Sequence, residues 1–199
     1  LAFGADIVVY SATKHIDGQG RCLGGAVLGY KDFISEVLHP YLRNTGPSLS
    51  PFNAWLLLKG LETLHLRIER QCQTAAEVAV YLAKQSTLQN VLYPFSDTHP
   101  QRDLARRQMR QGGSMVSFEI KGGKESVFRF LNALNLIRLS NNLGDSKTLI
   151  THPATTTHAR LTPEARAAIG ISDGLVRLSI GLESSKDLLV DLDQALRKA

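Results

Sequence analysis

DIVVYSATK, residues 6–14, decides how the N-terminal part of the chain is organised. It starts with a continuous, mostly β-branched run, residues 6–10, which is too short for a helix and typical of a strand buried on both faces. Ser11, Thr13 and Lys14 follow directly on this run. In open α/β sheets, ligands gather just outside the carboxyl ends of the strands. The segment therefore predicts a strand that ends at a ligand site.

The side chains after this strand suit one kind of ligand. If the backbone stays extended, Ser11 and Thr13 point to one side and offer two hydroxyl donors to a phosphate dianion. A lysine in a partly desolvated pocket, as we expect for Lys14, has an amine that is available as a Schiff-base nucleophile and proton shuttle. Pyridoxal 5′-phosphate requires this combination. From these residues alone, a solvated lysine in a polar loop is still the favoured interpretation.

A second strand and a well-marked helix follow. Residues 24–30, GGAVLGY, predict a second buried strand, entered through the glycine-rich turn at 17–20. Residues 31–42 are expected to be helical. Ser50 then stands as an N-cap with Pro51 at the first helical position, which is a strong start for a further helix.

A long amphipathic helix is expected from Ile68 onward. Apolar or small residues recur at offsets 4, 7, 8, 11, 14 and 15 from it, the spacing of one helical face that packs into a core. Beyond this helix, short strands and helices alternate. The predicted elements are a strand near Val91, a helix over 101–110, a strand over 115–120 with Val116, Phe118 and Ile120 inward, a helix over 124–134, strands over 136–139 and 175–180, and a helix over 185–198. We therefore predict two α/β parts, residues 1–66 and 67–199.

The composition excludes several classes of protein. The 199 residues are 43% apolar and 21% charged, which is ordinary for a globular protein and excludes disordered, fibrous and disulfide-scaffold classes. A net charge of +5 is a weak argument for nucleic acid, and we expect none as a partner. Cys22 and Cys72 suit a reducing compartment, so a cytoplasmic location is expected. No long apolar window or signal peptide is present, so neither a membrane span nor membrane targeting is expected.

Three further motifs, a histidine pair, a glycine-rich stretch and an arginine-rich stretch, do not indicate a ligand site. His152 and His158 flank a proline without a zinc-ligand pattern, so no metal is expected. The glycines in residues 18–25 precede a strand and do not form a dinucleotide fingerprint. The arginine-rich stretch over 102–110 lacks interleaved aromatic residues, so a solvated face is favoured over a contact with RNA.

Residues 4–18 resemble the lysine segment of the Cys/Met-metabolism family of pyridoxal-phosphate enzymes. This family comprises cystathionine γ-synthases, cystathionine lyases, methionine γ-lyases and homoserine-ester sulfhydrylases. The similarity continues in the family's order through residues 44–52, 58–64, 143–145, 152–154 with 157–158, and 176–183. Two stretches, residues 17–21 and 140–145, most resemble the sulfhydrylases that use O-succinylhomoserine. The blocks cover essentially the whole chain.

The resemblance implies a role for each candidate site residue. Lys14 would be the Schiff-base lysine, with Ser11 and Thr13 on the cofactor phosphate. Arg177 matches the arginine that grips the substrate α-carboxylate. Asn142 falls where several relatives carry a serine beside that carboxylate, so its contact is only expected.

The alternation around Arg177 agrees with that role. Val176, Leu178 and Ile180 share one face of the predicted strand, whereas Arg177 and Ser179 share the other. A guanidinium on the face opposite the core can form a bidentate, charge-assisted pair with a carboxylate. A solvated arginine on a strand face is the alternative.

The resemblance also implies a fold and a reaction. Residues 1–66 would form the C-terminal part of a large cofactor-binding domain of the aspartate-aminotransferase type, fold type I. Residues 67–199 would form a smaller α/β domain that binds the substrate carboxylate. The expected reaction is γ-replacement on an O-acylhomoserine with sulfide to give homocysteine, in a homo-oligomer such as a dimer of dimers. Alternatives are a cystathionine γ-synthase, a cystathionine or methionine lyase, and a non-catalytic binding or assembly fragment.

Part of the family's machinery is not in this sequence. The family uses a glycine-rich phosphate loop, a tyrosine stacked on the pyridine ring and an aspartate on the pyridine nitrogen, all N-terminal to the lysine segment. Without the aspartate, the pyridine ring is a poor electron sink. We therefore expect this chain to be a C-terminal half that is inactive alone.

Overall fold

The structure, a computed structural model, describes all residues 1–199, and their contacts divide them into two units, Leu1–His65 and Leu66–Ala199. The elements of the first unit are β1 (Ile7–Ser11), β2 (Gly25–Gly29), the π-helix η1 (Phe33–Leu38), α1 (His39–Thr45) and α2 (Pro51–Glu62). The assignment of the two units to cofactor and substrate binding stays a prediction.

Strands β1 and β2 form a two-stranded antiparallel sheet in the first unit. Both predicted strands are confirmed, but the expectation that they are buried is wrong, and Leu28 of β2 is 50% exposed. Ile7 is 44% exposed and Val9 is 77% exposed. The reason is that β2 is the only strand paired with β1, and the buried apolar cluster of this unit is limited to Ala12, Cys22 and Leu57.

Helix α2 begins as its sequence predicts. The hydroxyl of Ser50 accepts a hydrogen bond from the Asn53 backbone N at 3.1 Å, and Pro51 occupies the first turn. Near its end, Gly60 lies against the turn that follows β1. A Cβ added at Gly60 would lie 2.1 Å from the Ile16 carbonyl oxygen, so only glycine allows this approach without displacement.

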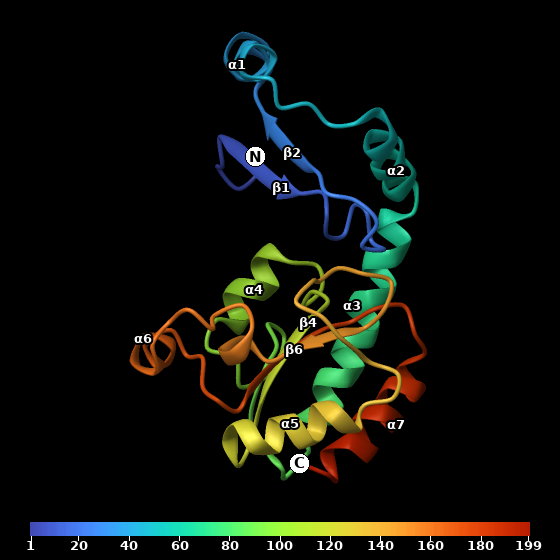
Figure 1. Cartoon of the computed structure of the whole chain (residues 1–199), viewed down its shortest axis with the longest axis vertical. Helices are drawn as coiled ribbons and strands as arrows, with labels where there is room; N and C mark the ends of the chain where they lie inside the picture. Colours follow the sequence, from blue (N-terminus) through green and yellow to red (C-terminus); the bar gives the residue numbers. More distant parts are fainter. The chain divides into compact units, whose positions relative to one another are not determined.

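The second unit contains a five-stranded sheet in the order β3-β4-β7-β6-β5. Its pairs are antiparallel except for β5 with β6, which are parallel. The elements of this unit are α3 (Leu64–Leu82), β3 (Leu88–Leu92), α4 (Arg102–Gln108), β4 (Met115–Ile120), α5 (Gly123–Ala133), β5 (Arg138–Leu139), β6 (Leu149–Thr151), the 3₁₀ helix η2 (Pro153–Thr155), α6 (Pro163–Ala168), β7 (Leu175–Ser179) and α7 (Ser185–Leu196). Figure 1 shows these elements along the chain.

Helices α3, α5 and α7 share one buried core with the central strands β4 and β7. The predicted inward residues of β4 are confirmed: Val116 and Phe118 are fully buried and Ile120 is 1% exposed. Phe118 meets Phe130 of α5 edge to face, with ring centroids 5.8 Å apart. The core therefore lies between the helices and one face of the sheet.

The long helix differs from its prediction in which residues are buried. Its buried face also includes Gln71, Thr74 and Val78, whereas Ala83 lies beyond the helix and is exposed. None of the helices in the chain combines the length and the apolar character needed to cross a membrane.

Candidate active site

The chain turns immediately after β1, at the residues singled out for the ligand site. The Lys14 backbone N donates to the Ser11 carbonyl at 3.2 Å, and the Asp17 N donates to the Ala12 carbonyl at 2.9 Å. The assumption of an extended backbone through Thr13 is therefore wrong. The reason is that two consecutive turn hydrogen bonds replace the sheet ladder, which ends at Ser11.

The turn gives Thr13 a different partner from Ser11. Its hydroxyl accepts from the Gly24 backbone N at 3.1 Å and donates to the Gly24 carbonyl at 3.3 Å. Thr13 thus ties the turn to the residue that precedes β2. Because a hydroxyl has one proton, Thr13 donates to a phosphate only by releasing the longer of these two bonds, the one to the Gly24 carbonyl.

Lys14 lies half-buried in this turn, next to Ala12, which is 2% exposed. The neighbouring His15 ring contacts the Tyr10 hydroxyl, with 3.4 Å between Nδ1 and the phenol oxygen. The lysine side chain therefore starts from a partly buried stretch of the chain, and its role as a reactive amine stays a prediction.

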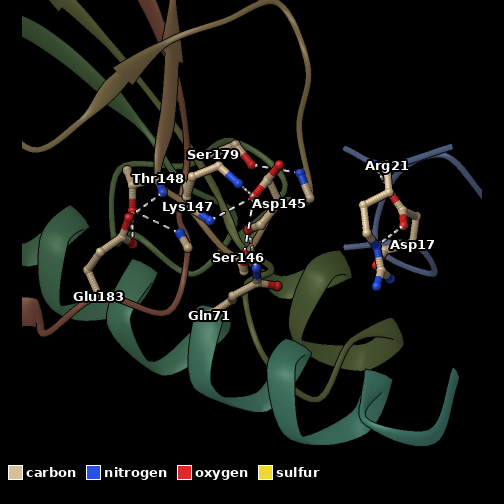
Figure 2. A network of polar contacts seen from close by, with 11 residues as sticks. Asp17, Arg21, Gln71, Asp145, Ser146, Lys147, Thr148, Ser179 and Glu183 are labelled. Atoms are coloured by element: carbon tan, nitrogen blue, oxygen red, sulfur yellow. Dashed lines mark hydrogen bonds and ion pairs between the residues drawn. The ribbon is translucent and has the colours of Figure 1, made fainter. Parts of the chain in front are cut away.

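An ion pair between the buried Asp17 and the exposed Arg21 anchors the far end of the turn. Asp17 is 1% exposed, and its carboxylate accepts from the Arg21 backbone N at 2.6 Å and from Arg21 Nε at 2.9 Å. Figure 2 shows this pair. Burial raises the pKa of Asp17, but the hydrogen bonds and charge of Arg21 outweigh it and hold this pKa below its ordinary value. The sequence marks residues 17–21 as a glycine-rich turn and as a stretch that resembles the sulfhydrylases, but it does not show this ion pair, because a pairing across four residues outside a helix has no periodic signature.

The donor set at this turn fits pyridoxal 5′-phosphate. Lys14 supplies a primary amine that can condense with an aldehyde, and Ser11, exposed at the end of β1, supplies a hydroxyl for an anionic oxygen. Thr13 supplies a second hydroxyl once it releases its bond to the Gly24 carbonyl. This chemistry, carried on a turn fixed at both ends, is what the cofactor would need from these residues.

Arg177 lies on the central strand β7 with the orientation that its sequence predicts. Its neighbours Val176 and Leu178 are fully buried against the helices, so Arg177 projects from the opposite face. Across the sheet it pairs with Ser117 of β4 and Thr151 of β6.

The guanidinium of Arg177 is held by two backbone carbonyls. Nη2 donates to the carbonyl oxygens of Asn141 at 2.8 Å and Asn142 at 3.2 Å, while the buried Nε has no hydrogen-bond partner in the protein. Burial lowers the pKa of Arg177 from its ordinary value, but a guanidinium stays protonated in proteins. A fixed, partly desolvated cation with N–H groups still to satisfy is suited to a carboxylate.

The loop that supplies those carbonyls is itself fixed (Figure 2). The Gly144 N donates to the Ser179 hydroxyl at 2.9 Å, and Gln71 Nε2 of α3 donates to the Asp145 carbonyl at 2.8 Å. Asp145 also accepts from Lys147, through its backbone N and its amine, each at 2.9 Å. Sequence reasoning missed Asn141, Ser179 and Gln71, because contacts through backbone carbonyls and distant strands leave no local pattern.

The predicted site residues thus form two groups, one in each unit. Ser11, Thr13 and Lys14 lie in the first unit, and Asn142 and Arg177 lie in the second. The structure brings the members of each group together. Asn142 contributes its carbonyl to Arg177, a contact that concerns its backbone and is independent of its side-chain type.

In the histidine pair and the arginine-rich stretch, His152, Arg102 and Arg106 have partners within the protein. Nε2 of His152 contacts the Asp173 carbonyl at 3.0 Å, and Nδ1 contacts the Thr155 hydroxyl at 2.9 Å, so both ring nitrogens are engaged. No group of three or more His, Cys, Asp or Glu side chains is placed to hold a metal. In the basic stretch, Arg102 pairs with Asp97 at 2.6 Å, and Arg106 lies 5.7 Å from the centre of the Phe95 ring.

Comparison with known proteins gives consistent matches along the chain. Residues 1–197 match the sequence profile of the Cys/Met metabolism PLP-dependent enzymes. An O-succinylhomoserine sulfhydrylase of Mycobacterium tuberculosis is 51% identical over 197 residues, covering 97% of this chain and 48% of that relative. An O-succinylhomoserine sulfhydrylase of Pseudomonas aeruginosa is 49% identical over 196 residues, covering 98% of this chain and 48% of that relative. The chain spans about half the length of the curated relatives it matches.

Solved structures agree with these matches. A cystathionine γ-synthase from Xanthomonas oryzae superimposes with a TM-score of 0.94 at 43% identity, covering 99% of this chain and 51% of that one. A structure described as an O-acetylhomoserine (thiol)-lyase from Campylobacter jejuni, with a pyridoxyl-lysine phosphate, gives a TM-score of 0.91 at 37% identity, covering 98% of this chain and 54% of that one. The mixed α/β fold is therefore the one found in these enzymes.

Proposed function

This chain belongs to the Cys/Met metabolism family of PLP-dependent enzymes, and we propose that it supplies the lysine and the carboxylate-binding arginine of an O-succinylhomoserine sulfhydrylase. The observation that carries this proposal is the identity of 51% and 49%, over nearly the whole chain, with two proteins described as having that activity. Two further features support it: the half-buried Lys14 on its anchored turn, and the carbonyl-held guanidinium of Arg177.

The proposed reaction is a γ-replacement that needs no oxidant. The bond between Cγ and the ester oxygen of O-succinylhomoserine breaks, and succinate leaves with the bonding electron pair. Hydrosulfide supplies the electron pair for a new bond between sulfur and Cγ, which gives homocysteine. Atoms and charge balance between these two reactants and two products.

Lys14 moves the protons in this proposal. Pyridoxal 5′-phosphate, when bound, supplies an electron sink that stabilises negative charge at the substrate Cα. The Lys14 amine takes the proton from Cα and then delivers or removes a proton at Cβ, because one mobile base can act at several neighbouring atoms. Ser11 and Thr13 bind the cofactor phosphate and so fix the position of the cofactor relative to the Lys14 amine.

Arg177 binds and orients the substrate in the same scheme. Its free N–H groups take the α-carboxylate, and the Asn141 and Asn142 carbonyls keep the guanidinium from rotating away. Holding the carboxylate fixes the direction of the Cα–H bond relative to the base, which lowers the barrier through orientation. Asn142 contributes to this site through its backbone.

We also propose that these 199 residues act as part of a longer polypeptide and do not turn over alone. Two observations support this: the chain covers 48% of its sulfhydrylase relatives, and apolar side chains of the β1–β2 sheet such as Val9 are 77% exposed. The assembly would be a homo-oligomer. Cys22 and Cys72 are free thiols, which supports the reducing environment of the cytoplasm.

The decisive assay compares substrates for the longer enzyme. Consumption of O-succinylhomoserine with sulfide, and release of homocysteine, are the expected results. Cleavage of methionine without an added nucleophile would favour the lyases instead, which include a methionine γ-lyase of Porphyromonas gingivalis that is 46% identical. Formation of cystathionine from cysteine in preference to sulfide would favour the cystathionine γ-synthases.

A further inference from the structure

Thr151 is the residue across the strand pair from Arg177, and it takes part in a chain of hydrogen bonds that ends at the guanidinium. It is 3% exposed, on the last position of β6. Its hydroxyl donates to Asn141 Oδ1 at 3.1 Å and lies 2.8 Å from the Thr156 hydroxyl. Residues directly opposite in adjacent strands point to the same face of a sheet, so Thr151 and Arg177 share one surface.

Each hydroxyl in this chain has one proton. Thr151 donates to Asn141 Oδ1, and Thr156 donates to the His152 carbonyl, 2.7 Å away. The contact between the two hydroxyls admits either one as the donor. The Thr151 hydroxyl is thus held between Asn141 and Thr156.

Asn141 connects this chain to Arg177. Its side chain accepts from Thr151, while its own carbonyl accepts from Arg177 Nη2 at 2.8 Å, the shorter of the two bonds that hold the guanidinium. Asn141 is therefore the one residue that contacts both the Thr151 hydroxyl and the guanidinium. Because the buried Nε of Arg177 has no partner in the protein, the carbonyl contacts at Nη2 set the orientation of the guanidinium.

We propose that Thr151 is a positioning residue for substrate carboxylate binding, acting through Asn141 on Arg177. This inference rests on the carboxylate role given to Arg177 under the proposed function. In this role the Thr151 hydroxyl acts through Asn141, by holding its carbonyl in the position at which it accepts from Arg177. Without the hydroxyl, Asn141 loses a buried donor, and Arg177 loses its fixed orientation toward a carboxylate.

Two ligands separate carboxylate binding from the rest of the site. L-Norleucine carries the α-carboxylate and α-amine but no leaving group at Cγ, and n-pentylamine is the same molecule without the carboxylate. Isothermal titration calorimetry on the cofactor-loaded enzyme gives the dissociation constant of each. A positioning role for Thr151 affects norleucine only.

The variants are Thr151→Val, which keeps the β-branched shape without the hydroxyl, and Thr151→Ser, which keeps the hydroxyl. Ser117→Ala is the matched control, because Ser117 flanks Arg177 on the other strand and its hydroxyl makes no hydrogen bond in the protein. We expect Thr151→Val to weaken norleucine binding about fivefold, the usual size for a lost buried hydrogen bond. Pentylamine binding should change less than about twofold in every variant, and Thr151→Ser and Ser117→Ala should bind norleucine like the wild type.

Arg177→Lys distinguishes failure of the inference from failure of the proposed function. If Arg177→Lys weakens norleucine binding and Thr151→Val does not, the positioning role of Thr151 is wrong while the role of Arg177 stands. The positioning role is also wrong if Thr151→Val weakens norleucine binding as much in the Arg177→Lys protein as in the wild type. Its effect would then not depend on the guanidinium. If Arg177→Lys leaves norleucine binding unchanged, the carboxylate role falls, and the inference falls with it. Loss of the effect of Thr151→Val in the Arg177→Lys background supports the inference.

Discussion

His152 shows how much one buried side chain can add to the pH dependence of the protein. It is 2% exposed, and its ring packs edge to face on Phe128 with centroids 5.6 Å apart. Burial lowers its pKa from the ordinary value, the Asp173 carbonyl and carboxylate act against this, and the charges of Lys124 and Arg166 add to it. The folded protein therefore holds His152 in the neutral form.

The sign of the resulting pH dependence follows from linkage. The unfolded chain binds a proton at His152 at a higher pH than the folded protein does. The contribution of His152 to the free energy of unfolding is therefore fully present above about pH 6.5 and is lost as the pH falls below that value. We expect the free energy of unfolding, measured by urea titration at pH 7.5 and 5.5, to fall on acidification. In His152→Gln this fall should be smaller, because the titrating group is gone.

His39 provides the control, since it is exposed and lies on a different element. His39→Gln should keep the dependence of the wild type. An identical fall in wild type and His152→Gln would contradict the structure's account of this ring.

The sequence indicates where two candidate site residues lie, but not which hydrogen bonds the site contains. The position of Lys14 after a strand follows from the β-branched run before it, and the outward face of Arg177 follows from strand alternation. The roles of both residues stay predictions. The Thr13–Gly24 bond and the Asn141–Arg177 bond do not, because each joins residues that are far apart in sequence and uses a backbone group. Such contacts depend on the tertiary fold, which sequence periodicity does not encode.

At the scale of an element, the packing of helix α2 on the turn after β1 depends on a glycine, Gly60. Gly60 packs against the turn that carries Lys14, and an added Cβ would meet the Ile16 carbonyl oxygen at 2.1 Å. We expect Gly60→Ala to destabilise the protein by about 1–3 kcal/mol, the usual cost of overpacking. The measurement is the free energy of unfolding by urea.

Gly25→Ala is the matched substitution in the same unit. There the nearest atom to an added Cβ is the Tyr10 carbonyl oxygen at 3.7 Å, an ordinary contact. We expect a change of less than about 0.5 kcal/mol for this variant. Equal losses in the two variants would mean that helix α2 does not pack closely on the turn.

Elements with a complete local pattern were predictable, whereas two short elements, β6 and α6, were missed. The alternation in β4 and the 19-residue amphipathic α3 gave the right structure, because each supplies several repeats of its period. Strand β6 was missed because its 3 residues are too few to show alternation, whereas β5, Arg138–Leu139, lies within the strand predicted over 136–139. Helix α6 was also missed, although Thr162 followed by Pro163 is the same start that marked α2, and Thr162 does accept from the Ala165 N at 3.2 Å.

At the scale of the whole molecule, the first unit leaves much apolar surface uncovered. The single tryptophan, Trp55 of α2, is 54% exposed, and its neighbour Phe52 is 65% exposed. Exposed apolar patches of this kind mark surfaces that other parts of a protein or a partner cover. The prediction that β1 is buried was wrong for the same reason. Whether a strand is buried depends on the elements packed against it, which its own sequence does not show.

Trp55 reports on this surface directly. In the isolated 199-residue chain we expect its fluorescence to peak where water-exposed tryptophans emit and to be quenched readily by acrylamide. In the longer enzyme proposed above, the emission should move to shorter wavelength and quenching should weaken. A blue-shifted, protected Trp55 in the isolated chain would show that the first unit buries this face by itself.

The central claim concerns the amine of Lys14, and one experiment tests it most directly. The longer enzyme is loaded with pyridoxal 5′-phosphate, reduced with borohydride, digested, and its modified peptide is sequenced by mass spectrometry. We predict loss of the visible absorption of the bound cofactor and a pyridoxyl group on Lys14 alone, with Lys31, exposed on the same unit, unmodified. A stable adduct on another lysine, or an unchanged yield of adduct in Lys14→Ala, would contradict the account.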